Sequence, residues 1–152
     1  MQKTTRKLYV AYGSNLHPDQ MRRRCPDAEI CGSGVIRNYD LTFWADRRGN
    51  GFATIVPKEG NQVPAGVWEI SGRDELALDR YEGFPYLYRK EEIEVELQDG
   101  SVITGMVYIM NEGRDVHPAL PSSTYYDVIA YGYETFGFDL SVLKAARDNL
   151  PG

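Results

Sequence analysis

The chain has 152 residues, of which 42% are hydrophobic and 26% are charged. This length and composition predict one soluble globular domain, covering residues 1–152, that can bury a core without a disulfide or a structural metal. The formal net charge is −5, from 17 basic and 22 acidic residues. That balance disfavours nucleic acid or an anionic membrane as the main partner.

Three short segments indicate where in the cell the protein is located and which residues are exposed to solvent. The apolar stretch near the N-terminus, residues 8–11, is too short for a secretory signal or a membrane span. Cys25 and Cys31 do not make a disulfide framework, and their spacing is not that of a metal site. We therefore expect reduced thiols in a cytoplasmic protein. The basic run Arg22-Arg23-Arg24 is expected to form a solvated helix face.

The apolar pattern predicts strands first, one helix embedded among them, a hairpin and then further helices. Ser71 and Asp74 form a capping arrangement at the start of the embedded helix, and Gly83 suits a left-handed C-cap at its end. Asp99-Gly100 is a hairpin signal. Strands are expected over residues 8–12, 35–45, 52–56, 66–70, 91–97 and 102–110, and helices over residues 18–24, 71–81, 122–133 and from Asp139 onward, with Leu140, Leu143 and Leu150 as the last apolar stripe.

This order lacks a regular alternation of strands with long helices, which argues against a doubly wound sheet. It predicts an α+β domain built on a small, curved, mixed β-sheet or barrel flanked by helices.

The segment Tyr12-Gly13-Ser14-Asn15 follows a predicted buried strand and precedes a helix start. Glycine permits positive φ and close ligand approach, and asparagine tolerates left-handed φ. Successive backbone N–H groups before a helix can converge on a negative group, so the segment is a candidate anion site. The alternative is an ordinary turn, which such a tripeptide by itself favours.

Glu82 falls on the last turn of the helix predicted over residues 71–81, just before Gly83. A carboxylate at this end of a helix is disfavoured by the helix dipole, and the aromatic residues Tyr81, Phe84 and Tyr86 surround it in sequence. Both effects raise a carboxyl pKa, which suits a group that moves protons. The alternative is that Glu82 continues a solvated acidic face of the helix.

Other arrangements are weaker candidates. Ser14 could act as a nucleophile with His117 as its base, but the second glycine of a Gly-x-Ser-x-Gly elbow is missing. His17 and His117 have no partners at metal-site spacing. Gly32-Ser33-Gly34 lacks the Gly-Lys-Ser/Thr of a phosphate loop.

Together these segments resemble the gamma-glutamyl cyclotransferase-like family, which includes AIG2-like proteins. The resemblance covers most of the chain. It rests on Val10-Ala11-Tyr12-Gly13-Ser14-Asn15-Leu16, Ala53-Thr54-Ile55, Gly66-Val67-Trp68, Leu78-Asp79-Arg80-Tyr81-Glu82-Gly83, Val107-Tyr108-Ile109-Met110 and Pro121-Ser122-Ser123-Thr124-Tyr125.

The resemblance implies a small mixed β-barrel with flanking helices, and an enzyme that cyclises a gamma-glutamyl amide to 5-oxoproline and releases an amine or amino acid. Glu82 matches the catalytic glutamate of the family. The backbone amides of Gly13, Ser14, Asn15 and Leu16 match its carboxylate-binding loop, and its pocket tyrosines correspond to Tyr12, Tyr88, Tyr108 and Tyr125.

This reaction requires no metal and no organic cofactor, because the substrate carries both its nucleophile and its electrophile. The expected partner is a small gamma-glutamyl compound, and the sequence leaves a monomer or a homodimer open. A non-catalytic module that binds a carboxylate or a protein on the same fold is the alternative.

Overall fold

The computed structural model describes residues 6–45 and 49–150. Residues 1–5, on which part of the expectation about a secretory signal rests, lie outside that range. Five strands close into a barrel, because the sheet order β3-β1-β5-β4-β2 is completed by pairing between β2 and β3, and β6 adds to the edge of β2. The strands are β1 (Arg6–Ala11), β2 (Glu29–Ala45), β3 (Phe52–Ser71), β4 (Tyr88–Leu97), β5 (Val102–Met110) and β6 (His117–Pro118).

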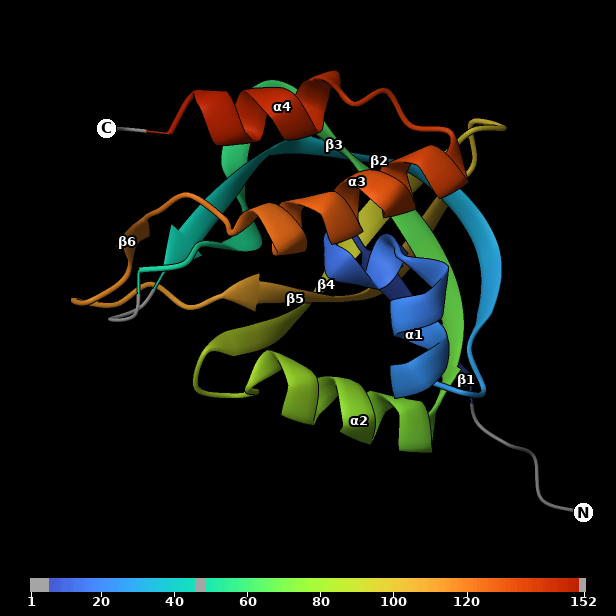
Figure 1. The fold of residues 1–152 in the computed structure, drawn as a ribbon. Helices are drawn as coiled ribbons and strands as arrows, with labels where there is room; N and C mark the ends of the chain where they lie inside the picture. The colour runs from blue at the N-terminus through green and yellow to red at the C-terminus, as the bar shows by residue number, and fades with distance from the viewer. Residues whose placement is uncertain (1–5, 46–48, 151–152) are drawn as a thin grey trace, which may run out of the picture.

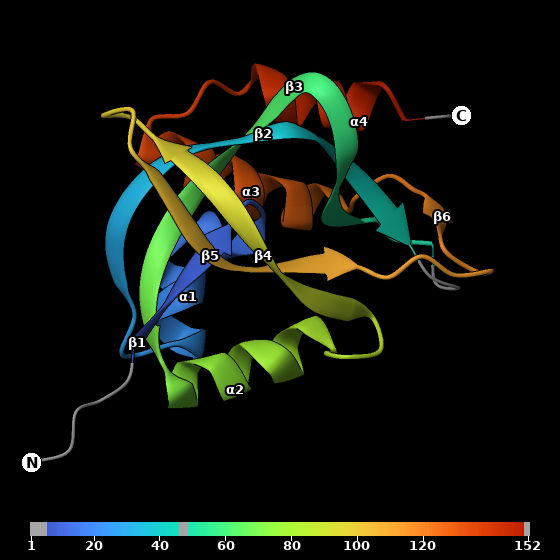
Figure 2. The same ribbon diagram turned by 180° about the vertical axis from the view of Figure 1, so that it is seen from behind.

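The barrel is mixed, since β1 pairs in parallel with β5 at Tyr9 and Met106 while its pairing with β3 is antiparallel. Helices surround it: α1 and α3 lie in front of the strands in Figure 1 and behind them in Figure 2, α4 lies along the top, and α2 lies across the bottom. The predicted α+β fold with a small mixed barrel is confirmed. The helices are the 3-10 turn η1 (Ser14–Leu16), α1 (Pro18–Arg24), α2 (Gly72–Glu82), α3 (Ser123–Phe136) and α4 (Ser141–Asp148).

The two short strands predicted over residues 52–56 and 66–70 are wrong as separate elements, because β3 runs through both. Its pairing with β2 is interrupted where Asn38, with a φ of 66°, stands opposite residues 58–61. The Asn38 side chain accepts a hydrogen bond there from the backbone N–H of Gly60 at 3.1 Å. The residues of this bulged stretch are polar and exposed, so the sequence shows no apolar alternation there that would predict a continuous strand.

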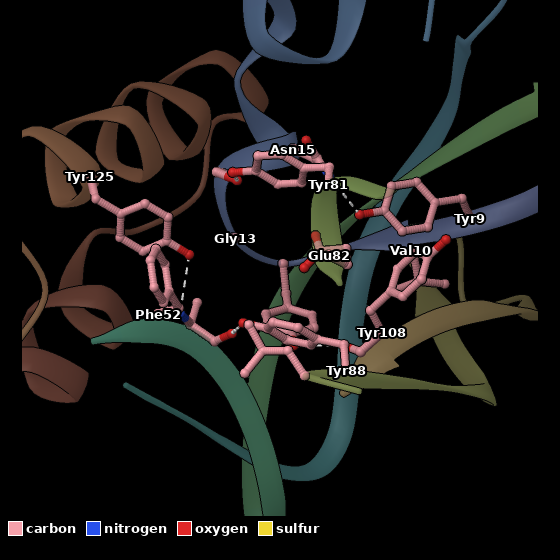
Figure 3. A pocket seen from close by; sticks show the side chains of 14 residues that line it. Tyr9, Val10, Gly13, Asn15, Phe52, Tyr81, Glu82, Tyr88, Tyr108 and Tyr125 are labelled. Carbon is pink, nitrogen blue, oxygen red and sulfur yellow. Dashed lines mark hydrogen bonds between the residues drawn. The ribbon is translucent and has the colours of Figure 1, made fainter. Parts of the chain in front are cut away.

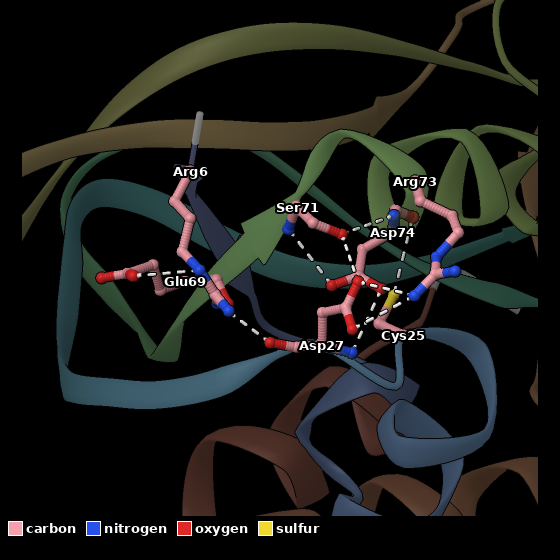
Figure 4. A network of polar contacts seen from close by, with 7 residues as sticks. All are labelled: Arg6, Cys25, Asp27, Glu69, Ser71, Arg73 and Asp74. Atoms are coloured by element: carbon pink, nitrogen blue, oxygen red, sulfur yellow. Dashed lines mark hydrogen bonds and ion pairs between the residues drawn. The ribbon is translucent and has the colours of Figure 1, made fainter. Parts of the chain in front are cut away.

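The start of α2 has the predicted capping box. The Ser71 hydroxyl accepts from the backbone N–H of Asp74 at 3.2 Å, and the Asp74 carboxylate accepts from the backbone N–H of Ser71 at 3.2 Å. Figure 4 shows how Asp27, which follows α1, joins this cap: it accepts from the Ser71 hydroxyl at 2.8 Å and pairs with Arg73 at 3.1 Å. These contacts fix α2 against the segment after α1.

The other end of α2 also matches the prediction, because Gly83 has a φ of 68° and closes the helix. The last helix begins later than expected, because Leu140 and not Asp139 is the N-cap of α4, although the Asp139 carboxylate still accepts from the backbone N–H of Ser141 at 2.8 Å. Leu143 of its apolar stripe is fully buried. None of the helices within the described residues is both long and apolar enough to cross a membrane.

Candidate active site

A cavity of about 240 Å³ opens between the end of β1, the start of β3, the end of α2 and helix α3. Figure 3 shows its side chains, with aromatic rings on several sides of Glu82. Among the described residues that line it, Glu82 alone carries a formal charge. The lining residues are Tyr9, Val10, Tyr12, Gly13, Ser14, Asn15, Phe52, Ala53, Tyr81, Glu82, Leu87, Tyr88, Tyr108 and Tyr125.

The structure therefore brings the predicted loop and the predicted acid to one cavity. Gly13, Ser14 and Asn15 line it from one side, and Glu82 lines it from the end of α2. Leu16 is the one predicted site residue that is absent from the lining. Its side chain is fully buried in the core, and its backbone N–H donates to the carbonyl of Gly13 at 3.0 Å. The Leu16 amide therefore makes its hydrogen bond within the η1 turn, and we do not include it among the donors of the cavity.

The backbone of the loop also differs from the expectation. Gly13 has a φ of −124° and a ψ of −131°, so it is not left-handed, and Asn15 is not among the residues with positive φ. Glycine is favoured here for a different reason: a Cβ at this position would lie 3.2 Å from the Cβ of Ala53, which is a tight contact. The loop approaches the start of β3 too closely for a side chain to fit without displacement.

Glu82 is the last residue of α2 and is half-buried, with its carboxyl group surrounded by protein atoms around the cavity. This burial raises the pKa of the carboxyl to about 7, and the positive charge of Arg24 acts in the opposite direction. The rise has the direction that its sequence position predicted. No described group donates a hydrogen bond to this carboxyl, so it is available to a ligand.

Three contacts hold the end of α2 that carries Glu82. The Asp79 carboxylate accepts from the Tyr108 hydroxyl at 2.6 Å, and it forms an ion pair with Lys90 at 2.8 Å. Lys90 also pairs with Glu75 at 2.7 Å, one turn earlier on the helix. Because Lys90 and Tyr108 belong to β4 and β5, these bonds tie α2 to the barrel.

The predicted pocket tyrosines all line the cavity, but three of their hydroxyl groups are used within the protein. Tyr12 donates to the backbone carbonyl of Tyr108 at 2.7 Å, and Tyr88 donates to the carbonyl of Ala53 at 2.7 Å. Tyr108 donates to Asp79, as described above. These three rings therefore shape the wall of the cavity, while their protons face protein acceptors.

Tyr125 differs from those three, because its hydroxyl accepts a hydrogen bond from the backbone N–H of Ala53 at 3.0 Å. Its oxygen would lie 3.8 Å from a Cβ on Gly13, which places it beside the loop. The Tyr125 proton is thus directed away from Ala53, on the side of the cavity where the loop lies.

Arg24 corrects an expectation about the basic run. Arg22 and Arg23 are exposed, but Arg24 is half-buried and turns toward the site. Its guanidinium lies over the ring of Tyr81, with Cζ 3.4 Å from the ring centroid, and it donates to the side-chain oxygen of Asn15 at 2.6 Å. It is therefore part of the structure that supports the loop.

Two further tyrosines, which the sequence did not predict as site residues, belong to the site. Tyr9 lines the cavity and its hydroxyl accepts from the side-chain amide of Asn15 at 2.9 Å. The hydroxyl groups of Tyr81 and Ser14 lie 3.0 Å apart and share a hydrogen bond. Alternation along β1 could not have identified Tyr9, because it groups the predicted pocket residue Tyr12 with Val10 and places Tyr9 on the other face of the strand.

The weaker candidates are not assembled into a second site. His17 caps α1, where its Nδ1 accepts from the backbone N–H groups of Asp19 and Gln20. His117 is exposed on β6 and does not line the cavity with Ser14. Within the described ranges, no three His, Cys, Asp or Glu side chains are grouped closely enough to hold a metal ion.

Comparisons with known proteins place this geometry in context. The family model described as gamma-glutamyl cyclotransferase, AIG2-like, matches residues 9–128. A gamma-glutamylcyclotransferase of Mus musculus is 32% identical over 152 residues, which cover 93% of this chain and 79% of that protein. The Homo sapiens gamma-glutamylcyclotransferase is 31% identical over 153 residues, with the same two coverages of 93% and 79%.

The solved structures agree with the sequence comparisons. One described as a gamma-glutamyl cyclotransferase superposes with a TM-score of 0.82 at 26% identity, over 97% of this chain and 89% of that one. The segment that the family model matches contains both sides of the cavity, since it includes Gly13 and Glu82.

Proposed function

The chain belongs to the gamma-glutamyl cyclotransferase, AIG2-like family, and from this premise we propose that it cyclises a gamma-glutamyl amide to 5-oxoproline and releases an amine or amino acid. The observation that carries the proposal is one cavity with a backbone loop on one side and a carboxyl of raised pKa on the other.

The loop side binds the α-carboxylate of the glutamyl group. The backbone amides of Gly13, Ser14 and Asn15 supply N–H donors, and the hydroxyl of Tyr125 lies beside them. Donors of this kind suit an anion without a full positive charge in the cavity. The rings of Tyr12 and Tyr88 then confine the carbon chain of the substrate.

Glu82 moves the protons. As a carboxylate it accepts a proton from the α-ammonium, and the free amine attacks the γ-carbonyl carbon. As a carboxylic acid it returns that proton to the leaving nitrogen when the amide bond breaks. The carboxylate so regenerated takes the second proton that the new ring nitrogen must lose, and this proton passes to the released amine. A pKa of about 7 lets the group perform both steps near neutral pH. General acid–base catalysis of this kind contributes about 10²- to 10⁴-fold.

Holding the substrate in a folded conformation provides the remaining rate acceleration. The nucleophile and the electrophile belong to one molecule, and holding them in reacting geometry gives effective molarities of about 10⁵ M or more. No step of this scheme uses a metal or an organic cofactor. We place the reaction in the cytoplasm, where the thiols of Cys25 and Cys31 stay reduced.

The experiment is to incubate the purified protein with gamma-glutamyl amino acids, gamma-glutamyl amines and gamma-glutamyl-ε-lysine, and to measure 5-oxoproline. Release that is proportional to enzyme concentration supports the proposal. If the panel is bound with measurable affinity and none of it is converted, the chain is a binding module and the proposed reaction is wrong.

A further inference from the structure

We propose that Tyr9 is a further catalytic residue, whose hydroxyl donates a hydrogen bond to the γ-carbonyl oxygen of the bound substrate as that oxygen becomes negative. The inference rests on the proposed function. It follows from the direction in which three linked side chains, Arg24, Asn15 and Tyr9, must donate their hydrogen bonds.

Arg24 sets that direction. A guanidinium can only donate, so the side-chain atom of Asn15 that lies 2.6 Å from it must be the oxygen. The amide nitrogen of Asn15 therefore faces Tyr9, and it donates to the Tyr9 hydroxyl oxygen at 2.9 Å. The backbone of Asn15 is held as well, because its carbonyl accepts from the Trp68 indole at 3.1 Å.

Tyr9 consequently acts as an acceptor toward Asn15, and its own proton must point elsewhere. No group within the described parts of the chain accepts that proton, although Tyr9 is only 4% exposed. The ring lines the cavity, and Figure 3 shows its hydroxyl directed toward the region of Glu82. The free proton is thus available inside the cavity, and a hydrogen-bond chain that starts at a cation strengthens it as a donor.

The Tyr81 hydroxyl is bonded to Ser14 of the loop, and the other four pocket tyrosines do not offer a proton at this place. Tyr12, Tyr88 and Tyr108 already donate to protein oxygens. Tyr125 also has a free proton, but its hydroxyl lies beside Gly13, where the carboxylate of the substrate is expected. Tyr9 is the donor that faces the acid.

The chemistry of the reaction identifies the acceptor. When the α-amine forms its bond to the γ-carbon, the π electrons of the carbonyl move to its oxygen. They return when the bond to the leaving amine breaks and Glu82 protonates that amine. Glu82 therefore serves the two nitrogens, and the oxygen requires a separate donor. Tyr9 keeps its proton throughout, because burial and then the nearby charge of Glu82 raise its pKa well above the ordinary value of 10.0.

The first test is Tyr9→Phe, which removes one hydroxyl and keeps the ring. We expect kcat to fall by about 10²-fold or more, as for loss of one oxyanion donor, with KM changed by less than about threefold. The pH at which kcat/KM is half-maximal should not move. A kcat within about threefold of wild type, or a rise in KM alone, would overturn the proposal.

A shift of the pH profile without loss of the plateau rate would also overturn it, because the hydroxyl would then be bonded to Glu82. These results differ from failure of the proposed function, in which the wild-type protein itself releases no 5-oxoproline.

A second variant leaves the cavity wall intact. Arg24→Met removes the donor that orients Asn15, so the Asn15 amide can turn and compete for the Tyr9 proton. We expect the rate at high pH, where Glu82 is ionised in both proteins, to fall by about tenfold, a change of about 1.4 kcal/mol. Arg23→Met, on the exposed side of the same helix, should match wild type. An unchanged high-pH rate in Arg24→Met would contradict the orienting chain.

Discussion

The guanidinium of Arg24 lies over the ring of Tyr81, with its Cζ 3.4 Å from the ring centroid, and so joins the end of α1 to the end of α2. Tyr81 in turn shares a hydrogen bond with Ser14, and Arg24 donates to Asn15. A closed set of contacts thus holds the loop at a fixed distance from the helix turn that ends in Glu82.

This relationship predicts an electrostatic effect. The charge of Arg24 lowers the pKa of Glu82 against the larger effect of burial. Removing that charge in Arg24→Met should therefore raise the pKa, and less of the catalytic base should be ionised at a given pH below about 8. The measurement is kcat/KM from pH 5 to pH 9, and the acidic limb should move to higher pH. If it stays in place or moves to lower pH, Arg24 does not act on Glu82.

The raised pKa of Glu82 also predicts a pH-dependent cost in stability. The carboxyl has a pKa of about 7 in the folded protein and an ordinary value of 4.5, so the folded state binds more protons between these limits. Stability from this group therefore falls as the pH rises from 4.5 to 7. We compare the free energy of unfolding of Glu82→Gln with that of wild type at each pH. The difference in favour of the variant should be larger at pH 8 than at pH 5 by about 2–3 kcal/mol.

Urea unfolding at both pH values measures this difference. Glu94→Gln is the matched control, because Glu94 is an exposed carboxylate on β4 and its substitution should have the same small effect at either pH. A gain for Glu82→Gln that is equal at pH 5 and pH 8 would show that the pKa of Glu82 is not raised in the folded state.

The close contact between Gly132 of α3 and Leu16 leads us to expect that a side chain at position 132 destabilises the fold. A Cβ at this position would lie 2.6 Å from the Cβ of Leu16 and 2.7 Å from its backbone carbon. Gly132→Ala should destabilise the fold by about 2 kcal/mol or more, although alanine favours a helix by about 1 kcal/mol. Gly72→Ala, which meets nothing within 4 Å, should be neutral or stabilising, and equal unfolding midpoints for the two variants would contradict this account.

The tight space around Gly13 leads us to expect that a larger residue there weakens substrate binding. A Cβ there would lie 3.2 Å from Ala53 and 3.8 Å from the Tyr125 hydroxyl, both of which line the cavity. Gly13→Val should raise KM by about tenfold or more, which corresponds to about 1.4 kcal/mol of lost binding. Steady-state kinetics test this, with Gly113→Val in an exposed loop as the control. An unchanged KM would mean that the loop is only a turn.

Much of this architecture follows from local sequence signals. Ser71, Asp74 and Gly83 mark the ends of α2 through capping chemistry that depends on neighbouring residues. Strand β5 begins and ends where its apolar run does, at Val102 and Met110. The continuity of β3 could not be predicted in the same way, because its exposed middle residues show no apolar pattern and the strand is aligned by pairing with β2 on both sides of the bulge.

In the candidate site, too, local motifs could be predicted from the sequence and long-range contacts could not. The loop and Glu82 could be identified from the order of short motifs, but the contacts that join them are long-range. The sequence predicts a solvated face for Arg22-Arg23-Arg24, but consecutive helical residues point about 100° apart, so three of them cannot share one narrow face. Which arginine turns inward depends on Tyr81, which is 57 residues away, and no local pattern reports that contact.

The central claim is that Glu82 transfers the protons in a cyclisation that forms 5-oxoproline. The most direct test is the rate of 5-oxoproline release by Glu82→Gln, measured at pH 8 on the best wild-type substrate and beside Glu94→Gln. We expect Glu82→Gln to fold, to bind substrate with a similar KM and to lose at least about 10²-fold in kcat, while Glu94→Gln keeps the wild-type rate. A folded Glu82→Gln protein that releases 5-oxoproline at the wild-type rate would contradict the account.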